Sequence, residues 1–262
     1  MITDSHCHLD KVKLDAFNGR IENMLNDARA KGVTQFLCVC IDMEHFEDVH
    51  TIAQNFDDVY CSVGLHPTHR DGLEPDVELL ARLSTKEHVI ATGETGLDYF
   101  HFKNGADMTW QHERFRTHIR AARETDKPLI IHTREAKEDT IRILREEKAD
   151  EVGGVMHCFV EDWETAQQAL DLGFYISFSG IVTYNSAEEL QQVAKKVPED
   201  KILIETDSPW LAPTPNRGKP NRPAYVTYVA EKIAELRETD YEHIGKITTR
   251  NFNTLFKSSD PG

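Results

Sequence analysis

Short apolar and β-branched runs alternate along the chain with charged stretches in which apolar residues recur at helical spacing. The apolar runs are typical of strands buried on both faces of a parallel sheet, and the charged stretches are typical of amphipathic helices. Strands are predicted at residues 2–6, 35–39, 59–63, 89–92, 129–131, 154–156, 174–177 and 202–204. The clearest helices are predicted at residues 17–30, 110–123, 136–147 and 163–172.

This alternation predicts an α/β fold, a (β/α)8 TIM barrel. A chain of 262 residues is the usual size for one such barrel, so we expect a single domain spanning residues 1–262. An open doubly wound sheet is the alternative. The nucleotide-binding glycine signatures of open sheets are missing from the sequence, which favours the barrel. The proline-rich segment 208–223 is predicted to be a long loop after the last strand.

Polar residues with metal-ligating side chains lie at equivalent places, just after the predicted strands. They are His6, His8, Glu94, His132, His157 and Asp207. In a barrel the C-terminal ends of the strands converge on one mouth, so we expect these side chains to become neighbours. The alternative for any single histidine is a buried, hydrogen-bonded polar residue.

Imidazole and carboxylate ligands together suit zinc, manganese or iron, and one carboxylate can bridge two ions. Glu94 is the predicted bridge. We therefore expect two divalent metal ions, and the sequence leaves their identity open among zinc, magnesium and manganese.

Several motifs resemble the TatD family of metal-dependent deoxyribonucleases, within the amidohydrolase superfamily, along essentially the whole chain. They are Asp-Ser-His-Cys-His-Leu-Asp at 4–10, Gly-Leu-His-Pro at 64–67, Gly-Glu-Thr-Gly-Leu-Asp-Tyr at 93–99, Pro-Leu-Ile-Ile-His at 128–132, His-Cys-Phe at 157–159 and Glu-Thr-Asp-Ser-Pro-Trp-Leu at 205–211. The resemblance implies one ion held by His6, His8, Glu94 and Asp207, and a second held by Glu94, His132 and His157. The chain departs from the family pattern at Thr95 and at Val160-Glu161, and an acidic Glu161 near the mouth would disfavour a phosphate.

The resemblance also implies a phosphodiester hydrolase, an exonuclease whose substrate is single-stranded DNA or RNA, with a metal-bridged hydroxide as the nucleophile. The expected catalytic residues are Asp207, which would orient the water and accept its proton, with Glu94 and Glu205. Glu205 would be a hydrogen-bonding partner behind the metal ligands. The alternative for Glu205 is a buried, paired carboxylate.

Substrate binding is predicted at His66 and Arg134, which lie nearest to strand ends, and at Tyr99, which together with Phe100 offers a surface for stacking on a base. Further cationic or imidazole side chains in the loops are His69, His101, Lys103, Arg217, Lys219 and Arg222. The alternative for each is a solvated loop charge, or a packing role for the aromatic rings.

The composition argues against a protein that binds nucleic acid without the help of bound metal ions. Thirty basic and 45 acidic residues give a net charge of −15, which opposes nucleic acid unless bound ions concentrate positive charge at the site. Two alternatives therefore stay open: a binuclear-metal hydrolase of a small amide, lactone or ester, and a non-catalytic metal-binding scaffold.

The chain carries five cysteines without a C-x-x-C pair, no secretory signal pattern, and no apolar run long enough to span a bilayer. We expect a cytoplasmic monomer without a membrane segment or an obligate protein partner.

Overall fold

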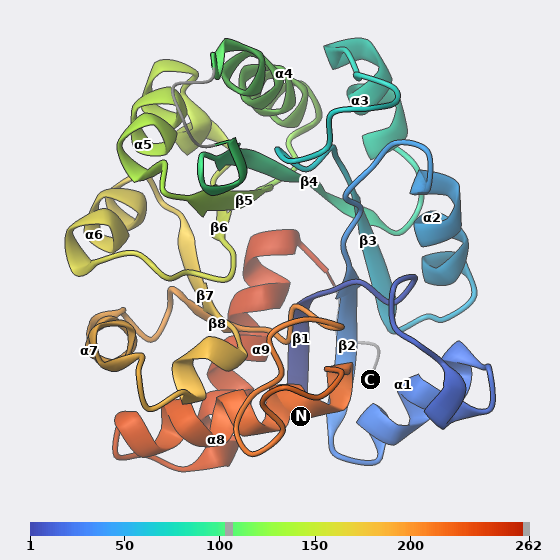
Figure 1. Ribbon diagram of the computed structural model, residues 1–262, viewed down its shortest axis with the longest axis vertical. Coiled ribbons are helices and arrows are strands. Elements are labelled where there is room, and N and C mark those ends of the chain that lie inside the picture. The colour runs from blue at the N-terminus through green and yellow to red at the C-terminus, as the bar shows by residue number, and fades with distance from the viewer. Residues whose placement is uncertain (103–106, 259–262) are drawn as a thin grey trace.

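Eight parallel strands surround the centre of the molecule in the computed structural model, which describes residues 1–102 and 107–258 (Figure 1). Each strand pairs with the next along the chain, in the order β1 to β8. The strands are β1 Ile2–Cys7, β2 Val33–Cys38, β3 Val59–Val63, β4 Val89–Asp98, β5 Leu129–Arg134, β6 Gly154–Met156, β7 Tyr175–Phe178 and β8 Ile202–Ile204.

The sheet curls until its first and last strands meet. Cys7 forms a parallel bridge with Ser208, His8 N–H donates to Ser208 O at 2.8 Å, and Asp207 N–H donates to His6 O at 2.9 Å. The result is a nearly closed barrel of eight parallel strands, and the predicted TIM-barrel fold is confirmed.

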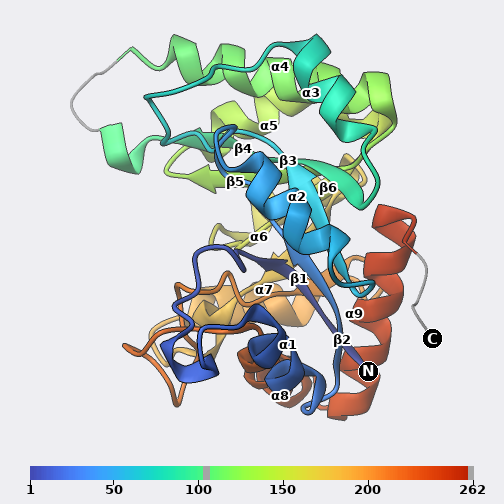
Figure 2. The ribbon, with the colours of Figure 1, turned by 90° about the vertical axis from the view of Figure 1, so that its right-hand side faces the viewer.

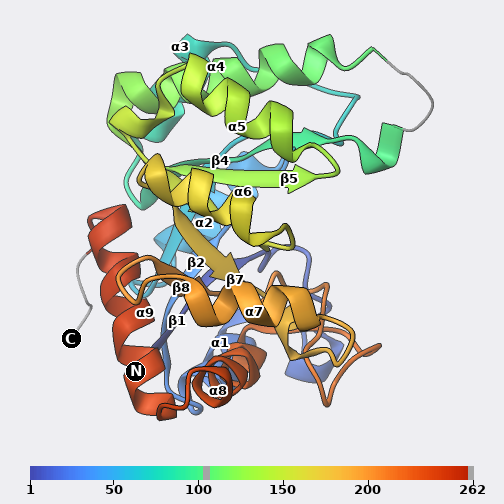
Figure 3. The same ribbon diagram turned by 90° about the vertical axis from the view of Figure 1, so that its left-hand side faces the viewer.

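Within residues 1–102 and 107–258, eight helices surround the barrel and a ninth covers one end. Figure 1 shows the surrounding ring. The helices are α1 Ile21–Arg29, α2 Phe46–Gln54, α3 Val77–Ser84, α4 Thr109–Thr125, α5 Lys137–Glu146, α6 Trp163–Asp171, α7 Glu188–Lys196, α8 Val226–Leu236 and α9 Tyr241–Phe256. Figures 2 and 3 show α9 at one end and the β8–α8 connection at the other. None of the helices in the described part of the chain has the length and apolar character needed to cross a bilayer.

The predicted helix at residues 17–30 begins later than expected. Residues Asp15–Phe17 form a short 3-10 turn, and Asn18 and Gly19 have φ angles of 54° and 71°. This left-handed backbone cannot continue a helix, so α1 starts at Ile21. Strand β4 in turn extends beyond the predicted 89–92, because the polar residues after its apolar start remain paired with β5 as far as Asp98.

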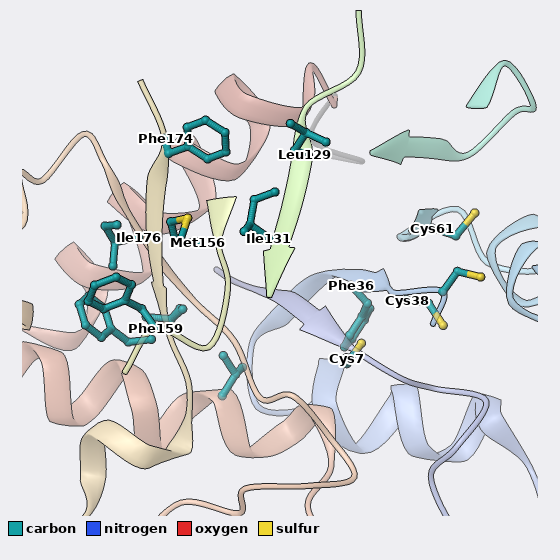
Figure 4. Packing of buried hydrophobic residues seen from close by; sticks show 14 of the residues in the cluster. Cys7, Phe36, Cys38, Cys61, Leu129, Ile131, Met156, Phe159, Phe174 and Ile176 are labelled. Atoms are coloured by element: carbon teal, nitrogen blue, oxygen red, sulfur yellow. The ribbon is translucent and has the colours of Figure 1, made fainter. Parts of the chain in front are cut away.

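Two apolar layers pack against the two faces of the sheet. The outer layer lies between strands and helices, and part of it is seen in Figure 4, where Leu129, Ile131 and Met156 gather near Phe174 and Ile176. The inner layer fills the barrel at the end covered by α9. It consists of Leu37, Val39, Ala91, Ile130, Val155, Tyr175 and Leu203 together with Phe252 and Phe256 of α9.

The inner layer determines where polar side chains can be placed. Side chains two apart on a strand share a face, so Ile130, Val155 and Leu203 are followed on the same face by the side chains of residues 132, 157 and 205. The barrel interior therefore changes from apolar at the α9 end, the floor, to polar at the opposite end, the mouth.

Candidate metal centre

A pocket of about 610 Å³ opens at the mouth of the barrel, and Glu94 lies among the residues that line it. Glu94 is 2 % exposed, and His6 and His8 are each 1 % exposed. The strand ends thus bring together side chains that are up to 201 residues apart in sequence, since His6 and Asp207 both belong to this group.

Three side chains, His6, His8 and Asp207, form a group with one oxygen of Glu94. The ring nitrogens His6 Nε2 and His8 Nε2 are 3.1 Å apart, and they lie 3.4 and 3.9 Å from Glu94 Oε2. Asp207 Oδ1 is 3.6 Å from His6 Nε2 and 3.3 Å from His8 Nε2. Ligands held roughly 2.0–2.2 Å from a tetrahedral ion stand roughly 3.3–3.6 Å from one another, so this first group fits a small divalent cation.

A second group surrounds the other oxygen of the same carboxylate. Glu94 Oε1 lies 2.8 Å from His157 Nε2 and 3.2 Å from His132 Nδ1. His66 Nε2 is also close, at 3.3 Å from Glu94 Oε1 and 3.4 Å from His132 Nδ1. Glu94 thus shares one oxygen with each group, which is the arrangement expected of a bridging ligand.

A hydrogen bond on the far side of the ring fixes which nitrogen faces the group in His8, His157 and His132. His8 Nδ1–H donates to Val39 O at 2.9 Å, and His157 Nδ1–H donates to Glu205 Oε1 at 3.2 Å. His132 Nε2–H donates to Asp98 Oδ2 at 3.0 Å. Each neutral ring therefore turns a lone pair toward Glu94, as metal-ligating histidines do.

His66 is oriented in the opposite sense. The backbone N–H of Thr68 donates to His66 Nδ1 at 3.2 Å, so a neutral His66 carries its proton on Nε2. The atom that points toward Glu94 and His132 is then a donor. This distinguishes His66 from the three lone-pair histidines and suits contact with a substrate oxygen, the role predicted for it.

Two buried carboxylates stand behind the ligands. Glu205 is fully buried and accepts hydrogen bonds from His157 and from the backbone N–H of Cys158 at 2.8 Å. Asp98 accepts the His132 hydrogen bond and two more from His101, one from its backbone N–H at 3.0 Å and one from Nδ1 at 2.9 Å. The sequence reasoning missed Asp98, although its position four residues after Glu94 places it on the same face of β4.

The charges of the site depend on one another. Burial opposes ionisation of Glu94, but His157 and His66 outweigh it and hold the pKa of Glu94 well below its usual range. Burial likewise lowers the pKa of His157, but Glu94 and Glu205 outweigh it and raise that pKa well above its usual value. The histidines that neighbour Glu94, Asp207 and Asp98 lower the pKa of each of these carboxyl groups, so the site carries negative charge that divalent cations would offset.

Comparison with known proteins agrees with this geometry. The family model described as "TatD related DNase" matches residues 3–257. The chain belongs to this family. It is 46% identical over 256 residues to the uncharacterized metal-dependent hydrolase YcfH of Escherichia coli (strain K12), covering 97% of this chain and 95% of YcfH. It is 42% identical over 258 residues to the uncharacterized metal-dependent hydrolase YabD of Bacillus subtilis (strain 168), covering 98% and 99%.

A crystal structure shows the same fold in a TatD homologue. YjjV of Escherichia coli K12 superposes with a TM-score of 0.89 at 29% identity, covering 98% of each chain. The expected class, a metal-dependent hydrolase of the TatD family, is therefore confirmed, whereas the number and identity of the ions and the substrate stay predictions.

The other predicted substrate residues fall into two sets in this TatD-family barrel. His101 and Arg134 line the pocket beside His66. Tyr99 is not among the described residues that line it, because its hydroxyl turns outward to Asp139 Oδ2 at 2.6 Å and His112 Nε2 at 2.7 Å. Lys103 lies outside the described residues. Within the described part of the chain, the pocket lining also does not include Phe100, Glu161, His69, Arg217, Lys219 or Arg222.

One helix of the ring holds the loop that carries His66. Three buried polar residues lie on one face of α4, at Gln111, Arg114 and His118. Leu65 N–H donates to His118 Nε2 at 3.0 Å, Arg114 Nη1 donates to His66 O at 3.0 Å, and Gln111 Nε2 donates to Asp98 O at 3.1 Å. Their helical spacing was visible in the sequence, but their partners 13 to 53 residues away were not.

Proposed function

We propose that this protein is a metal-dependent phosphodiesterase that degrades single-stranded nucleic acid, DNA in the first place, from an end. The observation that carries the proposal is the Glu94 carboxylate, which contributes one oxygen to each of two groups of lone-pair donors. Membership of the TatD related DNase family supports the choice of a phosphodiester.

Two divalent ions, when bound, would acidify a water molecule and neutralise charge on a phosphoryl oxygen. His6, His8, Glu94 and Asp207 would hold one of them, and Glu94, His132 and His157 the other. Asp207 is the candidate general base. Burial raises the pKa of Asp207, but the hydrogen bond from His8 and the neighbouring histidines outweigh it, so the carboxylate is ionised and able to accept a proton at neutral pH.

His66 and Arg134 would hold the substrate. His66 Nε2–H points to the space beside Glu94 and can donate to a phosphoryl oxygen. Arg134 lies farther out on the pocket wall, with its guanidinium 3.8 Å from the centre of the Phe100 ring, where it can face the next phosphate. Tyr99 is left out of this proposal, because it is not among the described residues that line the pocket.

Burial of the metal centre supports a flexible substrate. Glu94 is 2 % exposed at the base of a pocket of about 610 Å³, a size typical of sites for small ligands. The end of a flexible single strand can enter a pocket of this size more readily than a rigid duplex. We therefore favour an exonuclease over an enzyme that cuts within duplexes.

A second candidate is a binuclear-metal hydrolase of a small amide, lactone or ester. The same pocket size and the net charge of −15 favour it, since long-range repulsion lowers the affinity for a polyanion. A non-catalytic metal-binding scaffold has less support, because all six expected ligands are present and grouped.

The test is cleavage of end-labelled oligonucleotides by metal-stripped protein reloaded with magnesium, manganese or zinc. Single-stranded DNA, single-stranded RNA and a blunt duplex are compared, and product length is followed over time. We expect metal-dependent, progressive shortening of single strands that is lost in Asp207→Asn and retained in Asp200→Asn, an exposed matched control. Survival of every oligonucleotide together with turnover of a lactone or amide would favour the second candidate.

A further inference from the structure

The pocket above the metal centre has two chemically different sides. The loops after β3 and β4 and the last residue of β5 contribute polar side chains, including Thr68, His101 and Arg134. The loops after β6, β7 and β8 contribute apolar ones. These are Val160, Ile181, Trp210 and Leu211.

The apolar side is exposed in a way that is rare in this protein. Val160 is 44 % exposed and Trp210 is 46 % exposed. Among the described residues only Met1 and Leu73 are other large hydrophobic side chains with comparable exposure, and neither lines the pocket. Exposed apolar surface beside a pocket marks a place where something binds.

Trp210 is held in a fixed position beside the metal ligands. Its backbone N–H donates to Asp207 O at 3.0 Å, and its carbonyl accepts from Asn221 Nδ2 at 2.6 Å. Asn221 is buried and also donates to Thr206 O at 2.8 Å. The indole packs edge-on against the His8 imidazole, with ring centres 5.0 Å apart and planes at 66°.

A ligand that satisfies both sides must carry an anion and a flat apolar group a short distance apart. His66 and Arg134 offer donors for the anion, and a fixed, exposed indole offers its surface to a planar ring. An alkyl chain would bury against Val160 and Ile181 without needing an aromatic partner. A nucleotide has both parts, and stacking on an aromatic side chain tolerates any base.

We propose that Trp210, with Val160 and Ile181 beside it, forms a subsite on which a nucleobase stacks while the phosphate of the same nucleotide lies at the metal centre. This inference rests on the proposed function and extends it, because it assigns the recognition of the base to one side chain. It replaces Tyr99 as the stacking residue. Purines offer the larger ring surface, so they bind more tightly than pyrimidines.

The test compares two ligands that differ only in the base. Manganese-loaded protein is titrated with dAMP and with 2-deoxyribose 5-phosphate by equilibrium dialysis, using the wild type, Trp210→Ala, Trp210→Phe and the control Trp163→Phe. We expect the wild type and the control to bind dAMP about 5- to 150-fold more tightly than the sugar phosphate. Trp210→Ala loses that preference, Trp210→Phe keeps most of it, and the sugar phosphate binds equally to all four proteins.

Fluorescence gives a second readout. The chain has three tryptophans, so a Trp110→Phe, Trp163→Phe double variant leaves Trp210 as the single emitter. We expect saturable quenching by dAMP, weaker quenching by dCMP, and none by the sugar phosphate.

The subsite is disproved if the wild type binds both ligands equally, binds neither, or keeps its preference in Trp210→Ala. These outcomes are separate from failure of the proposed function. An intact base preference in a protein that cleaves no oligonucleotide would reject the nuclease and retain the nucleotide subsite. If the protein cleaves oligonucleotides but binds dAMP no more tightly than the sugar phosphate, the subsite alone is rejected.

Discussion

The floor and the mouth of the barrel are built on the same strands but from opposite chemistry. At the floor, Ile130 and Val155 pack against Phe252 of α9, all at most 2 % exposed. Two positions further along the chain from Ile130 and Val155 are His132 and His157, which contact a buried carboxylate. Apolar burial at the floor stabilises the folded protein. The buried charges at the mouth destabilise it unless opposite charges neutralise them.

This difference means that stability and chemistry can be changed separately. Removing a floor side chain should lower the free energy of unfolding and leave the arrangement of the ligands intact. Removing a mouth side chain should cost metal binding and activity. Four substitutions test the contrast, in order of decreasing expected effect.

Glu94→Gln should have the largest effect. The amide cannot offer a charged oxygen to either group of ligands, so we expect activity on the proposed substrate to fall by roughly a thousandfold or more and the bound metal to fall below two ions per chain. Manganese should raise the unfolding midpoint of the wild type, because it binds the folded state, and should raise that of Glu94→Gln much less.

Metal content, oligonucleotide cleavage and thermal unfolding with and without manganese are the measurements for this variant. The exposed Glu78→Gln serves as the control. A variant that still holds two ions and gains the full thermal stabilisation would show that Glu94 is not the bridge.

Phe252→Ala is the corresponding change at the floor. This ring is fully buried among the inner apolar residues, so its loss should lower the free energy of unfolding by about 3–5 kcal/mol. Activity per folded molecule should stay within about twofold of the wild type, because the ring does not line the pocket. Urea unfolding and cleavage below the transition measure both, and Phe56→Ala, at a half-buried ring, should cost less. A large loss of activity in folded Phe252→Ala would remove the separation between floor and mouth.

The strand positions and the grouping of the ligands could be predicted from the sequence, because they depend on local pattern and on the symmetry of a barrel. Strands at residues 59–63, 154–156 and 202–204 were placed to the residue, because short apolar runs between polar turns mark buried parallel strands. The ligands came together because the C-terminal ends of parallel strands must converge, which makes His6 and Asp207 neighbours without any knowledge of loops.

What the sequence did not predict depends on contacts between distant segments. The role of α9 required knowing which end of the barrel its phenylalanines enter, and the role of Asp98 required knowing the orientation of the His132 ring. The loop cations depend on loop paths that no periodicity describes. Arg222, for example, lies 3.6 Å from Asp27 of α1 and does not line the pocket described here.

His118 affects both stability and the site, because it is a buried polar side chain that supports the loop carrying His66. Burial lowers the pKa of His118 to about 4, while an unfolded histidine titrates near 6.5. Between these two values the unfolded chain binds more protons than the folded one, so stability falls as the pH drops from about 6.5 to about 4. The loss attributable to this group is on the order of 3 kcal/mol.

Urea unfolding at intervals across that pH range should show a shallower slope in His118→Gln than in the wild type. His243→Gln, the same change at a half-buried histidine of α9 that contacts Glu199, is the control and should alter the slope much less. If the slope of His118→Gln equals that of the wild type, then other groups account for the acid sensitivity.

Asp98→Asn should have the smallest effect, and it should distinguish the two groups of ligands at the mouth. Asp98 contacts His132 of the second group and none of the first, so the substitution should weaken the proposed second ion by roughly 10- to 100-fold and leave the first unchanged. Activity at saturating metal should recover toward that of the wild type, because every ligand is still present. Asp139→Asn, outside the pocket, should alter neither affinity. Calorimetric titration with manganese resolves the two steps, and a parallel loss of both affinities would mean that the two groups bind as one unit in which His132 and His8 cannot be oriented independently.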